Sequence, residues 1–157
     1  MHITIVLAIK SALMQHHSLV VRLVRVIAMC LLVFNGIGAL YGGYSLIAYP
    51  DGSDIHLDPA LLAHTPFPDY FVPGIILFIA NGVLSIVALI SLVLKHKKYY
   101  NYVLFQGCIL LGWLIIQILL IRKIDMMHYI MGITGTGMLV CGFIISRFNS
   151  HAIATAK

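Results

Sequence analysis

Amide side chains inside long apolar stretches are the groups of this sequence that are best suited to bind a ligand. Asn35, Asn81 and Gln117 each lie within such a stretch. Because an amide offers both hydrogen-bond donors and acceptors, a cluster of amides suits a polar lipid headgroup or a quinone carbonyl. The same side chains could instead join neighbouring helices, where an interhelical hydrogen bond contributes about 0.6 kcal/mol. We favour the interhelical interpretation and keep the ligand site open.

The depth of these amides in a membrane follows from the helical rise of ~1.5 Å per residue. Counted from one end of its helix, Asn35 lies at ~14 Å and Asn81 at ~20 Å, both near the midplane. Thr134 and Thr136 are expected at the same level, so that one polar layer forms there. Gln117 lies higher, at roughly 23 Å, near the external surface.

The segment of residues 49–74 has the most marked local pattern outside the apolar stretches. Asp58-Pro59 is typical of a helix N-cap followed by proline at the first helical position, which predicts a short helix to about His64. Asp69 is expected to cap the apolar stretch that follows. As a lid, this segment would turn Asp51, His64 and Asp69 toward a ligand or partner; as an interfacial segment, it would only orient the next helix. We favour the interfacial segment.

The sequence lacks the groups that most membrane enzymes and coupled transporters need. It contains no Glu, and all five acidic residues are Asp in or beside two connections between apolar stretches. Proton-coupled transport needs an ionisable group inside the membrane. The three cysteines form no C-x-x-C pair, which argues against dithiol chemistry and favours packing roles. We predict no catalytic residue, no metal site and no cofactor.

Four apolar stretches of membrane-spanning length surround these groups. The chain is 61% hydrophobic and 10% charged, with a mean hydropathy of +1.02, which does not describe a water-soluble fold. About 20 apolar residues span a hydrocarbon core of ~30 Å. The expected fold is an all-α membrane protein with a four-helix bundle and an external loop that carries a short interfacial helix. The spans are expected at about 26–49, 73–94, 102–121 and 127–146.

Basic residues are distributed unevenly between the two sides of this bundle. Eight of the ten flank the spans on the side of both termini, and only Arg122 and Lys123 lie on the side of all five Asp. Since basic flanks stay in the cytoplasm, both termini are expected inside and residues 50–72 outside. The charge therefore indicates orientation in the inner (cytoplasmic) membrane of a cell, as a multi-pass protein. Anionic lipid headgroups suffice as partners, and no nucleic-acid surface is expected.

Three parts of the chain follow from these spans. Residues 1–21 are expected to form a cytoplasmic leader or interfacial segment, residues 22–146 the transmembrane domain, and residues 147–157 a cytoplasmic tail. Lys10 interrupts the first apolar run before it reaches membrane length. An N-terminal extension outside the true protein is the alternative interpretation of residues 1–17.

Two motifs carry a resemblance to a known family: FNGIGALYGG at residues 34–43 and HTPFPDYFVPG at residues 64–74. Over roughly residues 22–146 the chain resembles an uncharacterised family of small bacterial four-helix integral membrane proteins, which is distantly similar to DoxX-like proteins. The resemblance is extended by Asn81-Gly82 and by Gly112-Trp113-x-x-x-Gln117. Some DoxX relatives are linked to quinone-dependent oxidoreductase complexes, which the resemblance implies only by analogy of fold.

Three functions are compatible with the sequence. A non-catalytic accessory or interaction subunit, in contact with a membrane protein partner or with copies of itself, fits the missing charges and the frequent glycines. A DoxX-like subunit that binds quinone or lipid would use Asn35, Asn81 and Gln117 under the external loop. A small uncoupled transporter is the third possibility, because a coupling carboxylate is absent. We favour the accessory subunit.

Overall fold

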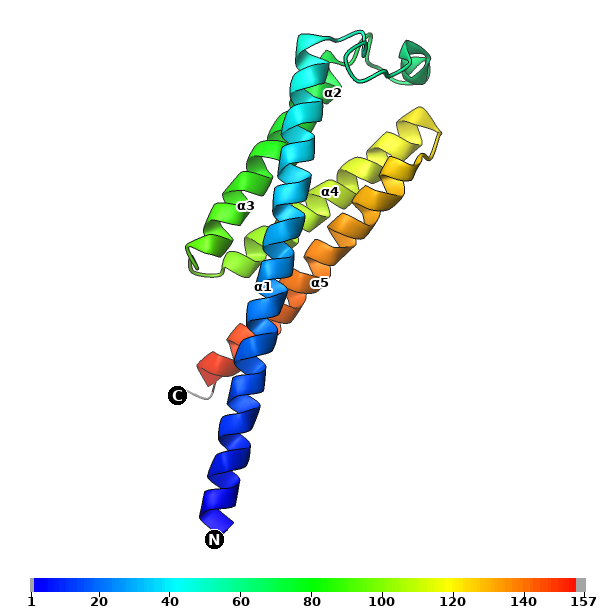
Figure 1. Ribbon diagram of the computed structural model, residues 1–157. Coiled ribbons are helices and arrows are strands. Elements are labelled where there is room, and N and C mark those ends of the chain that lie inside the picture. The colour runs from blue at the N-terminus through cyan, green and yellow to red at the C-terminus, as the bar shows by residue number, and fades with distance from the viewer. Residues whose placement is uncertain (1, 155–157) are drawn as a thin grey trace.

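The computed structural model describes the backbone of residues 2–154 and the side chains of Gln15 and residues 18–148. All regular structure in the described backbone is helical (Figure 1). Four helical segments are long and apolar enough to span a membrane, namely Ser18–Ala48, Phe71–Val93, Tyr99–Ile121 and Met126–Phe148. They confirm the predicted all-α fold with four spans. The helices are α1 (His2–Ala48), α2 (Phe71–Ile76), α3 (Leu84–Val93), α4 (Tyr99–Ile121) and α5 (Met126–Ala154), with a 3₁₀-helix η1 (Pro59–Leu62) and a π-helix η2 (Leu77–Val83).

Helix α1 begins well before the expected start of the first span at about residue 26. Helix α1 is continuous over 47 residues, which corresponds to ~70 Å, more than twice the hydrocarbon thickness of ~30 Å. Figure 1 shows its N-terminal part extending past the other helices. The backbone therefore has no break at the expected boundary between residues 21 and 22. Met1 and most side chains of the expected leader lie outside the described residues, so its interfacial role stays a prediction.

Close glycine contacts hold the first two spans together. A Cβ atom on Gly43 would lie 2.7 Å from the backbone nitrogen of Phe78, and one on Gly82 would lie 2.7 Å from Leu40 Cδ2. Such distances let two helix backbones approach far more closely than larger residues would allow. Helices α1 and α2–η2–α3 therefore form one tight pair.

A second pair, α4 with α5, is built in the same way. A Cβ atom on Gly107 would lie 2.9 Å from Leu139 Cδ2, and one on Gly142 would lie 2.7 Å from Leu104 Cγ. The glycine-rich sequence thus acts through helix contact in both pairs, as expected for membrane helices, in which dispersion replaces the hydrophobic effect.

The two pairs share a core at the end of the bundle where α3 connects to α4. Buried residues from every span meet there, including Leu32 of α1, Leu92 of α3, Val103 of α4 and Ile145 of α5. Toward the external loop the pairs diverge, as Figure 1 shows for α1 and the α4–α5 hairpin. The bundle is therefore closed at one end and splayed at the other.

The cysteines differ in their surroundings. Cys141 belongs to this shared core, whereas Cys30 and Cys108 are exposed on the outside of the bundle. The expectation that all three are packing residues is confirmed for Cys141 and wrong for the other two. Their helices face outward at these positions, toward the space that lipid fills.

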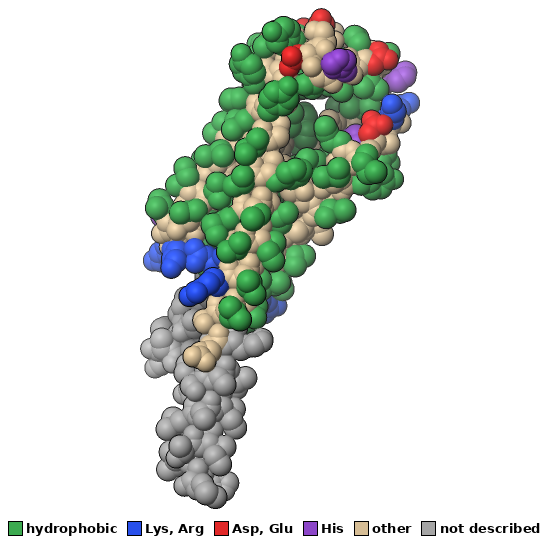
Figure 2. Space-filling view, viewed as in Figure 1, with side chains coloured by type: hydrophobic (Ala, Val, Ile, Leu, Met, Phe, Trp, Pro, Cys, Tyr) green, Lys and Arg blue, Asp and Glu red, His purple; other side chains and the backbone are tan. Residues whose placement is uncertain are grey.

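Charged side chains separate along the bundle as the sequence predicts. Figure 2 shows acidic side chains at the loop end and basic side chains grouped near the opposite end of the described surface. The basic group includes Lys95 and Lys98, both with positive φ in the tight connection between α3 and α4. The positive-inside rule predicts that this end faces the cytoplasm and that the loop lies outside.

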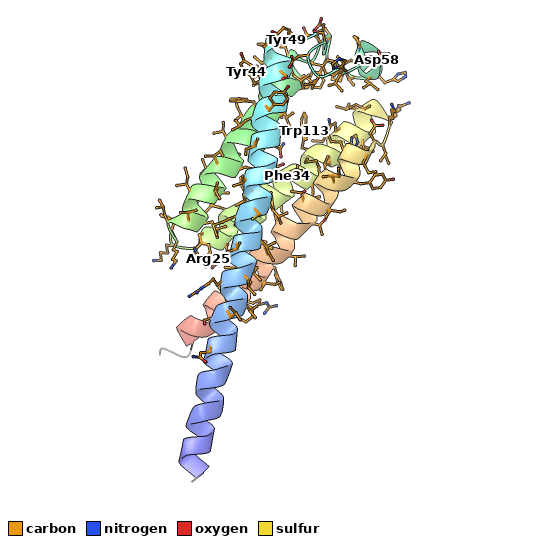
Figure 3. The ribbon with its side chains drawn as sticks, in the orientation of Figure 1. Arg25, Phe34, Tyr44, Tyr49, Asp58 and Trp113 are labelled. Carbon is orange, nitrogen blue, oxygen red and sulfur yellow. The ribbon has the colours of Figure 1, made fainter. Side chains whose placement is uncertain are left out.

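Arg25 joins α1 to the C-terminal end of α3. Its Nη2 donates a hydrogen bond of 2.8 Å to the carbonyl oxygen of Leu92, and its Cζ lies 5.2 Å from the centre of the Tyr99 ring (Figure 3). The carbonyl belongs to the last turn of α3, where a cation also meets the negative end of the helix dipole. A residue expected to mark the edge of the membrane is therefore part of the helix packing.

We predict that Arg25→Gln lowers the free energy of unfolding by about 1–3 kcal/mol, because a charge-assisted hydrogen bond and a cation–π contact are both lost. The measurement is unfolding in mixed detergent micelles followed by circular dichroism. Arg22→Gln is the matched control, since Arg22 is an exposed arginine one turn earlier on the same helix. Equal stability of the two variants would contradict the role of Arg25.

The external loop is folded by its own polar groups. Asp58 caps η1 by accepting a hydrogen bond of 2.9 Å from the N–H of Ala60, which confirms the predicted N-cap, although the helix ends at Leu62 and does not reach His64. Tyr70, which is 4% exposed, donates its hydroxyl to the carbonyl oxygen of Asp58 at 2.7 Å. Asp69 accepts a hydrogen bond of 2.9 Å from the N–H of Phe71, the first residue of α2, but the N-cap is Tyr70, which makes no side-chain capping bond, so the cap expected at Asp69 is not formed.

Removal of the Tyr70 hydroxyl is expected to loosen this loop. Tyr70→Phe removes one of the two donors to the carbonyl of Asp58 and leaves the N–H of Leu61, at a cost of about 1 kcal/mol. Proteolysis that depends on transient opening should then cut residues 50–70 about fivefold faster. The half-exposed Tyr49, at the end of α1, provides the control variant Tyr49→Phe. Unchanged cleavage of the Tyr70 variant would show that this hydrogen bond does not hold the loop.

Candidate functional site

A π-helix interrupts the second span at the level of the predicted polar layer. In η2 the N–H of Leu84 donates to the carbonyl of Ile79, five residues back, where an α-helix would use Ala80. The carbonyl of Ala80 is thereby freed for another donor. Short π-helical turns are rare and occur frequently at functional sites, which makes this segment the first place to examine.

Asn35 of α1 forms hydrogen bonds at the C-terminal end of this π-helix. Its side chain is 2% exposed, and its Nδ2 donates to the main-chain oxygen of Asn81 at 3.1 Å and to Ser85 Oγ at 2.8 Å. The amide therefore bridges a backbone carbonyl and a hydroxyl on the neighbouring span. Asn35 and Asn81 do come together, but through the main chain of Asn81.

Gln106 of α4 binds the carbonyl that the π-helix has freed. Its Nε2 donates to the oxygen of Ala80 at 3.2 Å, and the residue is 1% exposed. This bond connects the α4–α5 pair with the second span near the level where the pairs begin to diverge. We call Asn35, Asn81, Ser85 and Gln106 the amide layer; it joins three of the four spans.

Three atoms of the amide layer have no hydrogen-bond partner among the described residues. They are Oδ1 and Nδ2 of Asn81 and Oε1 of Gln106, and the two residues are 0% and 1% exposed. A buried polar group without a partner costs about 1–3 kcal/mol. Such atoms provide acceptors and a donor that a small polar group, a lipid headgroup or a buried water would satisfy.

The other predicted site residues lie outside the amide layer. Gln117 is partly exposed on α4, eleven residues and so ~16 Å beyond Gln106. Thr134 donates to the carbonyl of Ile130 in its own helix, and Thr136 is exposed, so the expected place of Thr136 in the polar layer is wrong. A helix surface turns through 200° between these two threonines, which prevents both from facing the bundle.

The three predicted loop residues, Asp51, His64 and Asp69, are not brought to the amides either. His64 is exposed, and the carboxylate of Asp69 accepts a hydrogen bond from the N–H of Phe71. Asp69 lines a shallow hollow of about 380 Å³ together with Asp51. Both the hydroxyl and the N–H of Ser53 donate to Asp51, and these hydrogen bonds lower the pKa of its carboxyl group.

Sequence reasoning missed Ser85 and did not select Gln106 as a site residue. Ser85 lies four residues after Asn81, hence on the same helical face, and this spacing could have identified it. Gln106 was recognisable as an amide within the third span, but its partner is a carbonyl that only the π-helix makes available. Gly82, beside Asn81, was the one local sign that this helix departs from regular geometry.

The amide layer can bind through hydrogen bonds and contains no group that ionises near neutral pH. Amides and a hydroxyl recognise neutral carbonyls and hydroxyls, whereas acid–base catalysis requires a titratable side chain. Among the described residues no group of three or more His, Cys, Asp or Glu is placed to hold a metal ion. The chemistry available in the layer is thus recognition and helix association.

Fold and site together define an all-α, multi-pass membrane protein with a buried polar layer at a π-helix. No family model, no curated protein and no solved structure matches this chain. The similarity to DoxX-like proteins therefore stays a prediction from the sequence motifs.

Proposed function

We propose that this protein is a non-catalytic accessory or interaction subunit of the inner membrane. The observation that carries the proposal is the use of its buried amides. Asn35 and Gln106 both direct their NH2 groups to main-chain carbonyls of the second span, at 3.1 and 3.2 Å. These donors hold helices together and are not displayed to a substrate. An accessory subunit of this kind acts by binding another membrane protein.

The shape of the bundle supports the same proposal. The helix pairs are tight within themselves and share a core only toward the cytoplasmic end. The splayed external half leaves helix faces with large apolar side chains exposed, such as Ile133 of α5 at 74%. In a membrane these faces can meet lipid or the helices of a partner by the same dispersion forces that hold the bundle.

Native mass spectrometry of the protein extracted from its own membranes in a mild detergent tests this role. We expect a second protein in fixed stoichiometry with the 17.4 kDa chain, retained in the Asn81→Leu variant because that side chain has no hydrogen-bond partner among the described residues. A bare chain would contradict an accessory role. Masses that are only multiples of the mass of this chain would indicate self-association and no second protein.

Binding of a quinone or lipid at the amide layer is a second candidate, in agreement with the DoxX-like resemblance. The unpaired atoms of Asn81 and Gln106 favour it, because a quinone carbonyl would accept from Asn81 Nδ2 and a hydroxyl would donate to either oxygen. Gln117, on the same face of α4 as Gln106, would line the path from the external side.

Quinone retained after purification distinguishes this candidate from the first. The wild type should retain it, whereas Asn81→Leu and Gln106→Leu should lose it in a protein that still unfolds cooperatively. Thr136→Val is the control, since it removes an exposed polar group of a span. Absence of quinone from the folded wild type, or equal retention in all variants, would contradict binding at the layer.

A further inference from the structure

A groove of about 600 Å³ follows one face of α5 and is separate from the amide layer. It is lined from His128, in the first turn, to Cys141, thirteen residues later, and is therefore ~20 Å long. Tyr129, Ile133 and Val140 contribute apolar walls. This length and polarity suit an alkyl chain.

The groove occupies the splayed half of the bundle. At its inner end a Cβ atom on Gly137 would lie 3.0 Å from Leu31 Cδ1, so α1 packs directly on α5 there. At Gly132, nearer the loop side, a Cβ atom would have nothing within 4 Å. The free space thus widens toward the external side, in the direction in which α1 and α5 diverge in Figure 1.

Positive groups gather where the groove reaches the membrane surface. Arg122 and Lys123, the two basic residues of the loop side, are exposed in the connection that leads into α5. The N-terminus of α5, a helix of 29 residues, adds a positive dipole end. Asp125 offsets part of this charge, with its Oδ1 3.6 Å from Lys123 Nζ.

His128 adds a hydrogen-bond donor at the same place. Its Nδ1 accepts from the N–H of Asp125 at 3.2 Å, so the neutral ring carries its proton on Nε2. Nε2 is buried and has no partner among the described residues. A donor, two cations and a helix N-terminus at one end of an apolar groove match the phosphate and ester oxygens of a phospholipid.

We propose that this groove binds one anionic phospholipid of the loop-side leaflet. One acyl chain lies along α5 from Gly132 toward Gly137, and the phosphate is held near Arg122, Lys123 and the first turn of α5. A lipid is the occupant that the position favours, because the groove lies within a membrane span and opens where bilayer chains are the surrounding material. The charge at its outer end selects an anionic headgroup.

Two matched glycine variants test whether the groove holds the lipid chain. Gly132→Leu fills the groove, and Gly112→Leu adds the same side chain on α4, where a Cβ atom also has nothing within 4 Å. The measurement is native mass spectrometry after equilibration in micelles containing phosphatidylglycerol or phosphatidylcholine. We expect one retained phosphatidylglycerol in the wild type and in Gly112→Leu, and a loss of about tenfold or more in Gly132→Leu.

A charge variant tests the headgroup. One net positive charge predicts a preference of about fivefold for phosphatidylglycerol over phosphatidylcholine, which Arg122→Gln/Lys123→Gln should abolish. Lys97→Gln, on the opposite side, should leave it unchanged. The proposal is overturned if the folded wild type retains no lipid, if both glycine variants lose it equally, or if the preference survives the double substitution.

Discussion

Replacing Gly43 by alanine is expected to disrupt the packing of α1 on the second span more than any other single methyl group would. The added Cβ would lie 2.7 Å from the backbone nitrogen of Phe78 and 2.8 Å from its Cα. Backbone atoms inside a helix cannot turn aside as a side chain can, so the two helices must separate. Overpacking of this kind costs about 1–3 kcal/mol or more.

Unfolding in mixed micelles measures this cost, and Gly38→Ala provides the control. Gly38 lies on the same helix, but a Cβ atom there would have nothing within 4 Å. Alanine at position 38 is expected to leave stability unchanged or to raise it slightly, because alanine favours a helix over glycine. If the two variants unfolded at the same midpoint, the close contact of Gly43 with Phe78 would not be a feature of the folded protein.

Asn35→Leu is expected to have the largest effect of any substitution in the amide layer. It removes both hydrogen bonds of Nδ2 and leaves the carbonyl of Asn81 and the hydroxyl of Ser85 buried without that donor. Two interhelical bonds in a membrane contribute ~1.2 kcal/mol on average, and stranded polar groups raise the cost to about 1–3 kcal/mol.

The control for Asn35→Leu is Thr136→Val, which removes a polar group from an exposed position of α5. Its unfolding free energy is expected to stay within about 0.5 kcal/mol of the wild type. A folded Asn35→Leu protein as stable as this control would show that the amide does not join α1 to the second span.

Features that depend on local rules or on overall hydropathy could be predicted from the sequence. The four spans follow from the length of the apolar stretches, and the cap at Asp58 follows from residue preferences at helix starts. A cap depends on a few neighbouring residues, and a span depends on the average hydropathy of a stretch. Both can be predicted without knowledge of how the helices pack.

The chain is helical well before residue 26, where the first span is expected to start, although Arg22 and Arg25 lie there. The helix does not stop at those charges. Arg25 folds onto the carbonyl of Leu92 and the ring of Tyr99, which satisfies the charge within the packing of the bundle. Hydropathy alone places a charged residue outside the membrane, because it carries no information about partners that the residue finds in the packed bundle.

The amide layer was only half predictable for a related reason. Depth along a straight helix brought Asn35 and Asn81 to one level, and that inference used only the helical rise. It could not indicate that Asn81 takes part through its carbonyl, because the π-helix that frees the neighbouring carbonyl of Ala80 changes the hydrogen-bond pattern of the second span. Depth alone also grouped Thr136 with residues that face the opposite direction.

The central claim is that the amide layer joins helices and that the side chain of Asn81 forms no hydrogen bond with the described residues of the folded protein. The most direct test compares the free energies of unfolding of Asn81→Leu, Asn81→Ala and Asn35→Leu in the same micelles. We predict that the better tolerated Asn81 variant lies within about 0.5 kcal/mol of the wild type, while Asn35→Leu loses about 1–3 kcal/mol. If both Asn81 variants lost as much as Asn35→Leu, the Asn81 side chain would itself stabilise the fold, and the structural account of the layer would be contradicted.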